Sequence, residues 1–455
     1  MNTIRAMDSY EKRIFKLSNG IRVLIIPSIS KTLTHVSVNI LLGEILEKLN
    51  EREMTHYAEH LLGRFTSKKY KDYKLIAKEL SSRGAETNAS VSEYQTTLYI
   101  NGFYKDLAYY ADLLSNVING FHIEKSLINQ EKQAVIREIT KYASDPEYVF
   151  HTKICKFTYK KINQFKCDNQ QSILNLKKYD EKDVYKYIHE KITNNNIVIS
   201  VTCPSDKIKE TEKIIKQYFS FIDKNQKSKP VAFSKQVKNI KNRQIIWVKN
   251  NNKVGNKVSG ININMRVYDD IKHMSSFHIA LMYFKEIFFN FETGVFYKKL
   301  RDTLGLVYYV RFNYFVPMAY PRMSIYDIST NVSAVNLTKT LKEIIGILEN
   351  LDVTDKDIES ARNRINRRES QKEINTFTSL NQHYMKFMIY NRPIMERSEI
   401  KKRILDIDKN VLKKEITRIK KKLLKKCLIF YYSSTNLNTK LKANINRKFK
   451  YNMCI

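Results

Sequence analysis

The sequence is short of the residues that mark fibrous, disordered and disulfide-stabilised proteins. Only 11 Gly and 7 Pro occur among its 455 residues, and 43% of the residues are hydrophobic, which excludes collagen-like and low-complexity chains. The five cysteines, at 155, 167, 203, 427 and 454, form neither a CxxC pair nor a regular framework. They therefore predict neither a disulfide scaffold nor a cysteine-based zinc site.

Long apolar runs are also missing. The longest, such as VLII at 23–26, are far too short to cross a bilayer. The N-terminal stretch contains no apolar segment of the kind that a secretory signal requires. Together with the cysteine pattern, these absences predict a soluble protein of the cytoplasm or of another reducing intracellular compartment, without a transmembrane segment.

Acidic residues are outnumbered, because 80 Lys and Arg face 46 Asp and Glu and leave a formal net charge of +34. Such a charge would attract nucleic acid, an anionic membrane or an acidic partner. The helix-like stretch KKEITRIKKKLLKK at 413–426 could bind polyanions without reading their sequence. However, the basic residues are spread along the chain and no zinc-finger, phosphate-loop or RNA-binding motif accompanies them. Composition alone is therefore the favoured explanation of the charge over nucleic-acid binding.

The two halves of the chain resemble each other at one fixed offset. This offset places residues 107–121 over 337–351, and both stretches carry apolar residues at a helical period. We infer two similar domains, an N-terminal one over 1–225 and a C-terminal one over 240–455, with a polar junction near 223–242.

Both halves mix strands with long helices. This mixture favours an α+β fold over a strictly alternating parallel sheet. Gly84 is expected to end one of the helices as a C-cap. In the first half we expect helices over about 52–65, 71–84, 105–119 and 124–143, and strands over 21–28, 33–43 and 90–102.

The segment HYAEH, residues 56–60, carries the strongest chemical signal. On a helix His56 and His60 lie one turn apart on one face, so both imidazoles can reach one metal ion, and Glu59 lies beside them. This arrangement can hold a zinc-bound water together with a base that deprotonates it. Two surface histidines on an amphipathic helix would give the same spacing.

A catalytic zinc needs three protein ligands and one open position, so a third ligand must come from elsewhere. Glu131 and Glu138 are two helical turns apart, which places them on one face of the helix expected over 124–143. Either carboxylate could complete the site, and each could equally be an ordinary solvated residue. At the offset that relates the two halves, the second half has no matching pair of histidines, so only the first domain would bind metal.

These features together resemble the pitrilysin and insulinase family of zinc peptidases with an inverted HxxEH motif, which includes the catalytic subunit of mitochondrial processing peptidase. The resemblance spans nearly the whole chain and implies two related α+β domains, each a mostly antiparallel sheet flanked by helices. Met54-Thr55 departs from the family pattern, which usually has two small residues before the motif. The matching segments are SNGIRV, HYAEHLL, RGAETNASVSEYQTTLYI, EKQAVIREI and KKLRDTLGLVYYV.

The resemblance implies a metal-binding or catalytic role for each residue around the motif. His56, His60 and Glu138 would bind one zinc ion per chain. Glu59 would be the general base, and Glu131 would support the site without binding the metal.

The resemblance also implies how substrate is held. Asn88, Ala89 and Ser90 match a family edge strand to which an extended peptide adds as a further strand, through main-chain hydrogen bonds. Arg301 and Tyr308 match a pair, at the same separation in the family, that holds the substrate backbone and helps to stabilise the oxyanion.

The sequence therefore predicts a zinc-dependent metalloendopeptidase that cleaves peptides or unfolded protein segments. The alternatives are a catalytically silent family member acting as an assembly or peptide-docking subunit, and a basic nucleic-acid-binding protein. Longer relatives close four such domains around the substrate, so a chain with two needs a partner. We expect a homodimer in which Arg301 and Tyr308 of one chain complete the zinc site of the other, or otherwise a heterodimer with a related subunit.

Overall fold

The computed structural model describes residues 12–158, 169–223, 244–249, 261–318, 321–373, 377–433 and 452–454. The chain forms two compact units, each of which is described by itself. Each unit combines most of one half of the sequence with one helical segment from the other half. The first unit contains Met1–Lys141, Ile162–Ala232 and Lys372–Arg397, and the second contains Tyr142–Lys161, Phe233–Gln371 and Ser398–Ile455.

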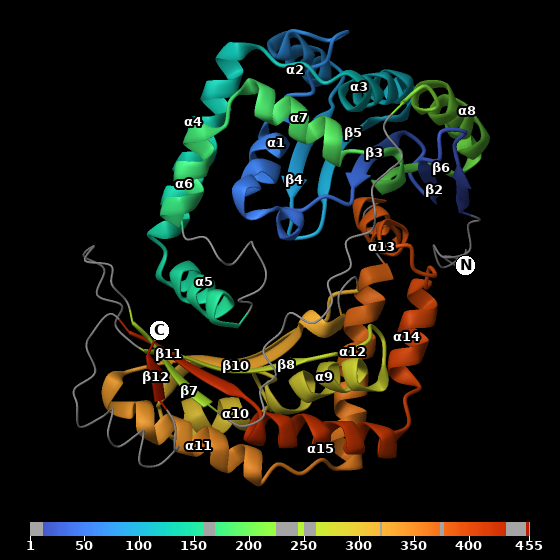
Figure 1. Ribbon diagram of the computed structural model, residues 1–455. Helices are drawn as coiled ribbons and strands as arrows, with labels where there is room; N and C mark the ends of the chain where they lie inside the picture. The colour runs from blue at the N-terminus through green and yellow to red at the C-terminus, as the bar shows by residue number, and fades with distance from the viewer. Residues whose placement is uncertain are drawn as a thin grey trace. The chain divides into compact units, whose positions relative to one another are not determined.

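A six-stranded sheet with the order β1-β2-β6-β3-β5-β4 forms the centre of the first unit (Figure 1). All its neighbouring strands are antiparallel except β2 and β6, which run parallel. Among the described residues β4 pairs with β5 alone, so its outer edge has no strand neighbour. The strands are β1 (Arg13–Lys16), β2 (Arg22–Ser28), β3 (Leu33–Ile40), β4 (Glu86–Val91), β5 (Thr96–Phe103) and β6 (Ile197–Pro204).

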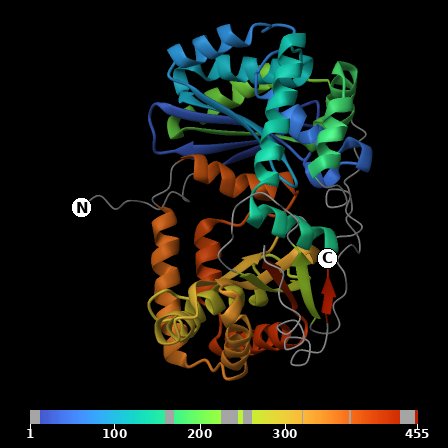
Figure 2. The same ribbon diagram turned by 90° about the vertical axis from the view of Figure 1, so that its left-hand side faces the viewer.

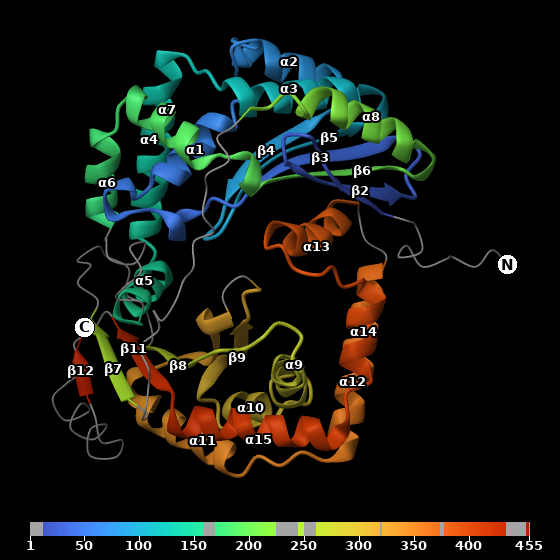
Figure 3. The same ribbon diagram turned by 45° about the vertical axis from the view of Figure 1, so that its right-hand side comes forward.

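Helices cover both faces of this sheet. α3 (Leu107–Gly120) and α8 (Ile208–Phe219) pack on one face, and α13 (Phe377–Ile389) packs on the other. Figures 2 and 3 show α13, in orange, on the side of the sheet opposite the blue and green helices. Leu24 on β2 and Val198 on β6 belong to the core under α13, while the alternate residues of these strands face α3 and α8. Burial on both faces explains why these strands are mostly apolar rather than alternating.

Two helices of the first unit carry the candidate site. α1 (Met54–Leu62) lies beside β4, and α4 (Lys125–Ala143) follows α3 (Figure 1). Both fall within ranges where the sequence predicts a helix, 52–65 and 124–143. The remaining helices of this unit are α2 (Tyr73–Ser82), α6 (Asn169–Lys178) and α7 (Glu181–Lys191).

Local signals set the ends of α2 and the path into β4. The Asp72 carboxylate accepts hydrogen bonds from the backbone N–H groups of Lys74 and Leu75, which caps the first turn. Gly84 follows the C-cap residue Arg83 at a φ of 65°, a left-handed conformation that glycine adopts without strain. The predicted C-cap is therefore off by one residue, because Arg83 is the C-cap and Gly84 takes the left-handed position that follows it.

The prediction of a single strand over 90–102 is wrong, because this segment contains the turn of a hairpin. β4 ends at Val91 and β5 begins at Thr96. The Ser92 N–H donates to the carbonyl oxygen of Gln95 (2.8 Å), and the Ser92 hydroxyl accepts from the Gln95 N–H (3.2 Å). A serine side chain closes this turn, so no glycine or proline interrupts the sequence.

The second unit has a sheet of the same size, with the order β12-β7-β11-β8-β10-β9. β7 runs parallel to its neighbours β12 and β11, and the other pairs are antiparallel. Together the two sheets confirm the predicted α+β fold with mostly antiparallel pairing. The strands are β7 (Gln244–Lys249), β8 (Ile261–Asp269), β9 (Val307–Phe315), β10 (Ser324–Val332), β11 (Leu428–Ser433) and β12 (Asn452–Cys454).

The helices of the second unit repeat those of the first. The offset between the sequence halves places α4 over α12 (Asp355–Glu373) at both ends, and the start of α3 over the start of α11 (Leu337–Glu349). No helix in the described part of the chain is both long and apolar enough to cross a membrane. The other helices are α5 (Pro146–Thr158), α9 (Ser276–Phe288), α10 (Val295–Tyr297), α14 (Arg397–Leu405) and α15 (Lys409–Lys425), with a π-helical turn over Lys298–Thr303.

The two sequence halves exchange one helix. α5 follows α4 in the chain, yet its apolar side chains Phe150, Ile154 and Phe157 pack against Ile246 and Phe430 of the second sheet. Likewise α13 follows α12 and packs on the first sheet. The exchange is thus reciprocal, and each sheet gains a cover on its second face.

Candidate metal centre

α1 presents three polar side chains on one face and its apolar side chains to the core. Tyr57 and Leu61 are fully buried, whereas His56, Glu59 and His60 are half-buried. One nitrogen or oxygen atom from each of these three side chains lies within 4.8 Å of those of the other two. In the described part of the chain, they form the one group of three or more His, Cys, Asp or Glu side chains close enough to share a metal ion.

Glu138 on α4 reaches both histidines. Its Oε2 lies 3.4 Å from Nε2 of His56, and its Oε1 lies 3.7 Å from Nε2 of His60. Two imidazole nitrogens and one carboxylate therefore converge, and this is a donor set that a catalytic zinc uses, with a fourth position left open. The side chains present fit the metal that the motif implies.

The opposite nitrogen of each imidazole contacts another carboxylate. Nδ1 of His60 lies 3.2 Å from Oε2 of Glu131, and Nδ1 of His56 lies 3.4 Å from Oε2 of Glu53. Carboxylates at Nδ1 favour a proton there and leave the Nε2 lone pair free for a metal. Both imidazoles thus share one orientation, with Nε2 toward Glu138.

Glu131 is buried but not isolated. Its Oε1 accepts a hydrogen bond from Nε of Arg64 (2.9 Å), and a second Arg64 nitrogen also contacts it. Burial would raise the pKa of Glu131, but the contacts with His60 and Arg64 outweigh it and hold the pKa below its ordinary value. Glu131 is therefore charged, and it contacts Nδ1 of His60, whereas Glu138 faces Nε2 of the same ring.

Glu59 differs from the other carboxylates of the site. Burial raises its pKa, the nearby Glu138 and Glu131 charges add to this effect, and His60 and His56 oppose it. A carboxylate with a raised pKa accepts and returns a proton more readily near neutral pH, as a general base requires.

A cavity of about 470 Å³ adjoins these side chains. Its walls include the polar face of α1, Glu131, Glu138 and residues 87–91 of β4, so Asn88, Ala89 and Ser90 border the same space as the histidines. β4 is mostly exposed and lies at the edge of the sheet. An extended peptide could pair with this edge beside the converging donor atoms.

Close packing holds α1 against β4. A Cβ atom on Gly63, at the C-terminus of α1, would lie 3.0 Å from Cβ of Ala89 and 3.2 Å from the carbonyl oxygen of Glu59. The end of α1 can approach the strand this closely because residue 63 has no side chain.

Arg301 and Tyr308 come together in the second unit. Arg301 lies in the π-helical turn, and its guanidinium carbon is 5.0 Å from the ring centroid of Tyr308 on β9. Gly305, at a φ of 56°, reverses the chain between them. Tyr308 is 78% exposed and therefore accessible to a ligand. The predicted site residues thus form two sets, with the metal and strand residues in the first unit and this pair in the second.

Two residues that contact the site residues were not identified from the sequence. Arg64 lies one helical turn after His60, and Glu53 lies one turn before His56. Both spacings bring side chains together on a helix. A search for charged residues at these spacings would therefore have found them.

Two family models match consecutive parts of the chain. A family model described as insulinase, peptidase family M16, matches residues 22–169. A second model, described as the peptidase M16 inactive domain, matches residues 178–365.

Individual relatives match at low identity. A probable mitochondrial-processing peptidase subunit beta from Arabidopsis thaliana is 24% identical over 50% of this chain and 42% of its own length. Cytochrome b-c1 complex subunit 1 from Homo sapiens is 31% identical over 28% of this chain and 26% of its own length. The matches thus span less than half of these curated relatives. A protease from Helicobacter pylori shares the fold, with a TM-score of 0.75 and 16% identity, over 93% of this chain and 99% of that chain.

Proposed function

Because the chain belongs to the insulinase family of peptidases, family M16, we propose that it is a zinc-dependent metalloendopeptidase. The convergence of His56, His60 and Glu138 beside Glu59 is the observation that supports this proposal most strongly. The substrates would be peptides or extended protein segments that lie along β4, at the cavity that borders the donor atoms.

Each part of the site would contribute one step. Zinc, held by His56, His60 and Glu138, would supply Lewis-acid chemistry when bound. The free edge of β4 would orient the peptide through main-chain hydrogen bonds. Glu59 would take a proton from the attacking water and deliver it to the leaving amine.

The variant Glu59→Gln, in which an amide nitrogen replaces one carboxylate oxygen, tests this proposal. Glu59→Gln removes the base but none of the three proposed ligands, so the variant should keep about one zinc per chain and lose peptide cleavage. Metal analysis and a fluorogenic peptide library measure both properties on the same preparation. Normal cleavage by this variant would show the mechanism to be wrong.

A catalytically silent role is the second candidate. The match to cytochrome b-c1 complex subunit 1 and to the inactive-domain model supports it. Such a protein would dock peptides or assemble with a partner without hydrolysis. The complete donor set and Glu59 favour the peptidase. A nucleic-acid-binding role has only the net charge of +34 in its support, and binding with a weak salt slope would exclude it.

We propose in addition that two identical chains associate, with Arg301 and Tyr308 of one chain completing the zinc site of the other. One chain carries both sets of site residues, and closed two-fold dimers are the commonest soluble oligomers. The relatives from Arabidopsis thaliana and Homo sapiens are both named as subunits. A heterodimer with a related subunit is the alternative.

We also propose that the protein works in the cytoplasm or another reducing intracellular compartment. In the described part of the chain, Cys155, Cys203 and Cys427 are buried and are not joined in disulfides, and burial raises the pKa of the Cys203 thiol to about 11. Such cysteines contribute packing rather than disulfides. Imaging of the full chain with a fluorescent tag tests the compartment.

A further inference from the structure

The segment that leads into α1 contains a buried arginine surrounded by carboxylates. Nη1 of Arg52 lies 2.8 Å from Oε2 of Glu47, and Nη2 lies 2.8 Å from Oε1 of Glu53. Oε2 of Glu44 is 3.5 Å from the same guanidinium. The side chains of Arg52, Glu47 and Glu53 are at most 10% exposed. A planar guanidinium with several donors can bridge carboxylates in this way, and a lysine ammonium cannot.

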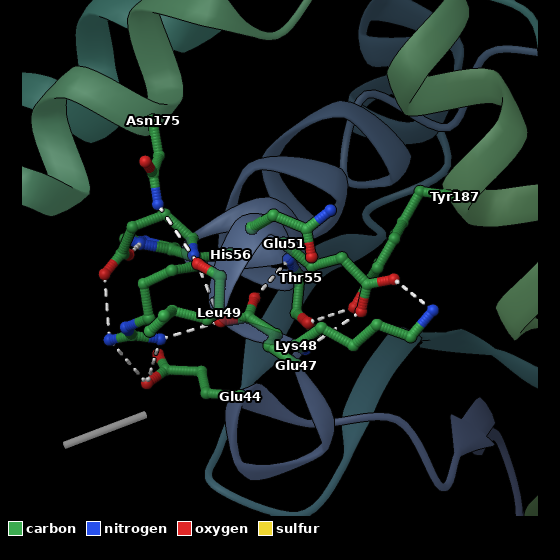
Figure 4. Close-up of polar contacts among 12 residues, drawn as sticks. Glu44, Glu47, Lys48, Leu49, Glu51, Thr55, His56, Asn175 and Tyr187 are labelled. Carbon is green, nitrogen blue, oxygen red and sulfur yellow. Dashed lines mark hydrogen bonds and ion pairs between the residues drawn. The ribbon is translucent and has the colours of Figure 1, made fainter. Parts of the chain in front are cut away.

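The same network holds the start of α1. The Glu47 carboxylate accepts hydrogen bonds from the backbone N–H groups of Glu53 (3.0 Å) and Thr55 (2.7 Å). The Thr55 hydroxyl is 2.7 Å from the Tyr187 hydroxyl on α7. Figure 4 draws Glu47, Thr55 and Tyr187 among the polar contacts of this segment. These bonds satisfy backbone donors that a helix N-terminus leaves without partners.

The neighbouring helices fix the segment from its other side. The side-chain amide of Asn175 on α6 donates to the carbonyl oxygen of Leu49 (3.4 Å; Figure 4). The Tyr179 hydroxyl donates to the carbonyl oxygens of Asn50 (3.0 Å) and Arg52 (2.8 Å). The backbone that carries Arg52 is therefore anchored independently of the metal site.

Glu53 has an unusual backbone conformation and two distinct contacts. Its φ is 72°, in the left-handed region that residues other than glycine rarely adopt. One of its carboxylate oxygens meets Arg52, and the other meets Nδ1 of His56. A residue in such a conformation persists when its surroundings hold it there. Contacts therefore run without a gap from Arg52 through Glu53 to His56.

The charges favour this arrangement. Burial would lower the pKa of Arg52, but the Glu53, Glu47 and Glu44 carboxylates outweigh it and raise that pKa, so the guanidinium stays charged. Burial would raise the pKa of Glu53, but Arg52 and His56 outweigh it and lower that pKa. Both partners of the Arg52 and Glu53 pair are therefore ionised in the folded protein.

We propose that Arg52 is a positioning residue of the metal centre, which acts by holding the Glu53 carboxylate on Nδ1 of His56 and so keeps Nε2 of His56 turned toward Glu138. The inference rests on the proposed function, because it requires a metal at this site. Glu53 would then be the carboxylate partner of His56, as Glu131 is the carboxylate partner of His60. Carboxylates that orient metal-binding histidines typically contribute about 10- to 100-fold to metal affinity.

Glu53→Gly is the first test, because glycine suits a φ of 72° and removes the carboxylate without backbone strain. We expect its zinc affinity, measured by competition with a chelator, to fall about 10- to 100-fold. The matched control is Glu51→Gln in the same segment. In the described structure Glu51 pairs with Lys191 (3.0 Å) and forms no ion pair with His56 or His60, so its zinc affinity should stay unchanged. Circular dichroism and thermal unfolding of the metal-free variants establish that both are folded.

A double-mutant cycle tests whether Arg52 acts through Glu53. Arg52→Lys keeps the charge but loses the bridge between carboxylates. It should weaken zinc binding several-fold in the wild-type background and cause no further loss in the Glu53→Gly background. An equal loss in both backgrounds would overturn the positioning role.

The imidazole N–H signals provide a spectroscopic readout that a general loss of stability would not change. In the zinc-loaded protein, the Nδ1 proton of His56 should give a downfield, exchange-protected NMR signal that Glu51→Gln keeps and Glu53→Gly loses. If the wild-type chain bound no zinc, the proposed function would fail and this inference with it. Equal zinc affinity in the wild type and in Glu53→Gly would overturn the inference alone.

Discussion

Nε2 of His56 lies 3.4 Å from Oε2 of Glu138, so two separate helices meet at one point. α1 supplies both histidines because a spacing of one helical turn places them on one face, and α4 supplies the carboxylate. Between the helices, the buried Tyr57 hydroxyl donates to the carbonyl oxygen of Ile128 (2.7 Å). The donor set therefore depends on the packing of α1 against α4 as well as on the motif.

Glu138 and Glu131 should respond differently to substitution, although they lie on the same helix. The Glu138 side chain is 45% exposed and that of Glu131 is 3% exposed. Glu138→Ala should abolish tight zinc binding and leave the stability of the metal-free protein almost unchanged. Glu131→Ala, by contrast, should lower the unfolding free energy of the metal-free protein by about 1–3 kcal/mol, because Arg64 loses its partner.

Urea unfolding of both metal-free variants, followed by zinc titration, separates the two roles. Retention of tight zinc binding in Glu138→Ala would contradict the assignment of Glu138 as a ligand.

Gly63 should be intolerant of even the smallest side chain. Gly63→Ala would place a methyl group 3.0 Å from Cβ of Ala89, so α1 and β4 would have to separate. We expect a loss of about 1–3 kcal/mol in unfolding free energy and a raised KM for peptides that lie along β4.

The matched control is Gly346→Ala in α11, where an added Cβ meets nothing within 4 Å. Alanine is the better helix former there, so this variant should gain about 0.5–1 kcal/mol. Equal stability of the two variants would mean that α1 and β4 are not closely packed.

Several of these features follow from the sequence, and the reasons for the exceptions are physical. Local spacing predicts that His56 and His60 share one helix face and that Glu131 and Glu138 share another. The choice of Glu138 as the third ligand is implied by the family resemblance, because spacing alone leaves both carboxylates possible. The bridge from Arg52 to Glu53 lies in a segment without periodicity, and tertiary packing brings its carboxylates together. The exchange of α5 and α13 was not predicted either, because an amphipathic pattern specifies a buried face without specifying which sheet covers it.

Zinc should stabilise the protein by linking α1 to α4. A ligand that binds the folded state alone adds about 2.7 kcal/mol when its free concentration is about 100 times its dissociation constant. Removal of zinc with a chelator should therefore lower the unfolding temperature, and added zinc should restore it.

The control for this effect is His60→Ala, which lacks one of the proposed ligands. Its unfolding temperature should not change with chelator or zinc. If chelator and added zinc also left the unfolding temperature of the wild-type protein unchanged, this result would argue against a metal bridge between the helices.

Complementation between inactive variants tests whether two chains share their sites. Glu59→Gln keeps Arg301 and Tyr308 but lacks the base, whereas Arg301→Ala keeps the complete zinc set. If Arg301 acts across a homodimer, a mixed dimer contains one site with both Glu59 and Arg301 intact. Random re-association of equal amounts should then restore roughly a quarter of the wild-type activity, because half of the dimers are mixed and each has one of two sites. The mixture should be dissociated and reassembled before assay, with each variant treated alone as the control. A chain that completes its own site, or one that pairs only with a different subunit, would show no recovery at any mixing ratio.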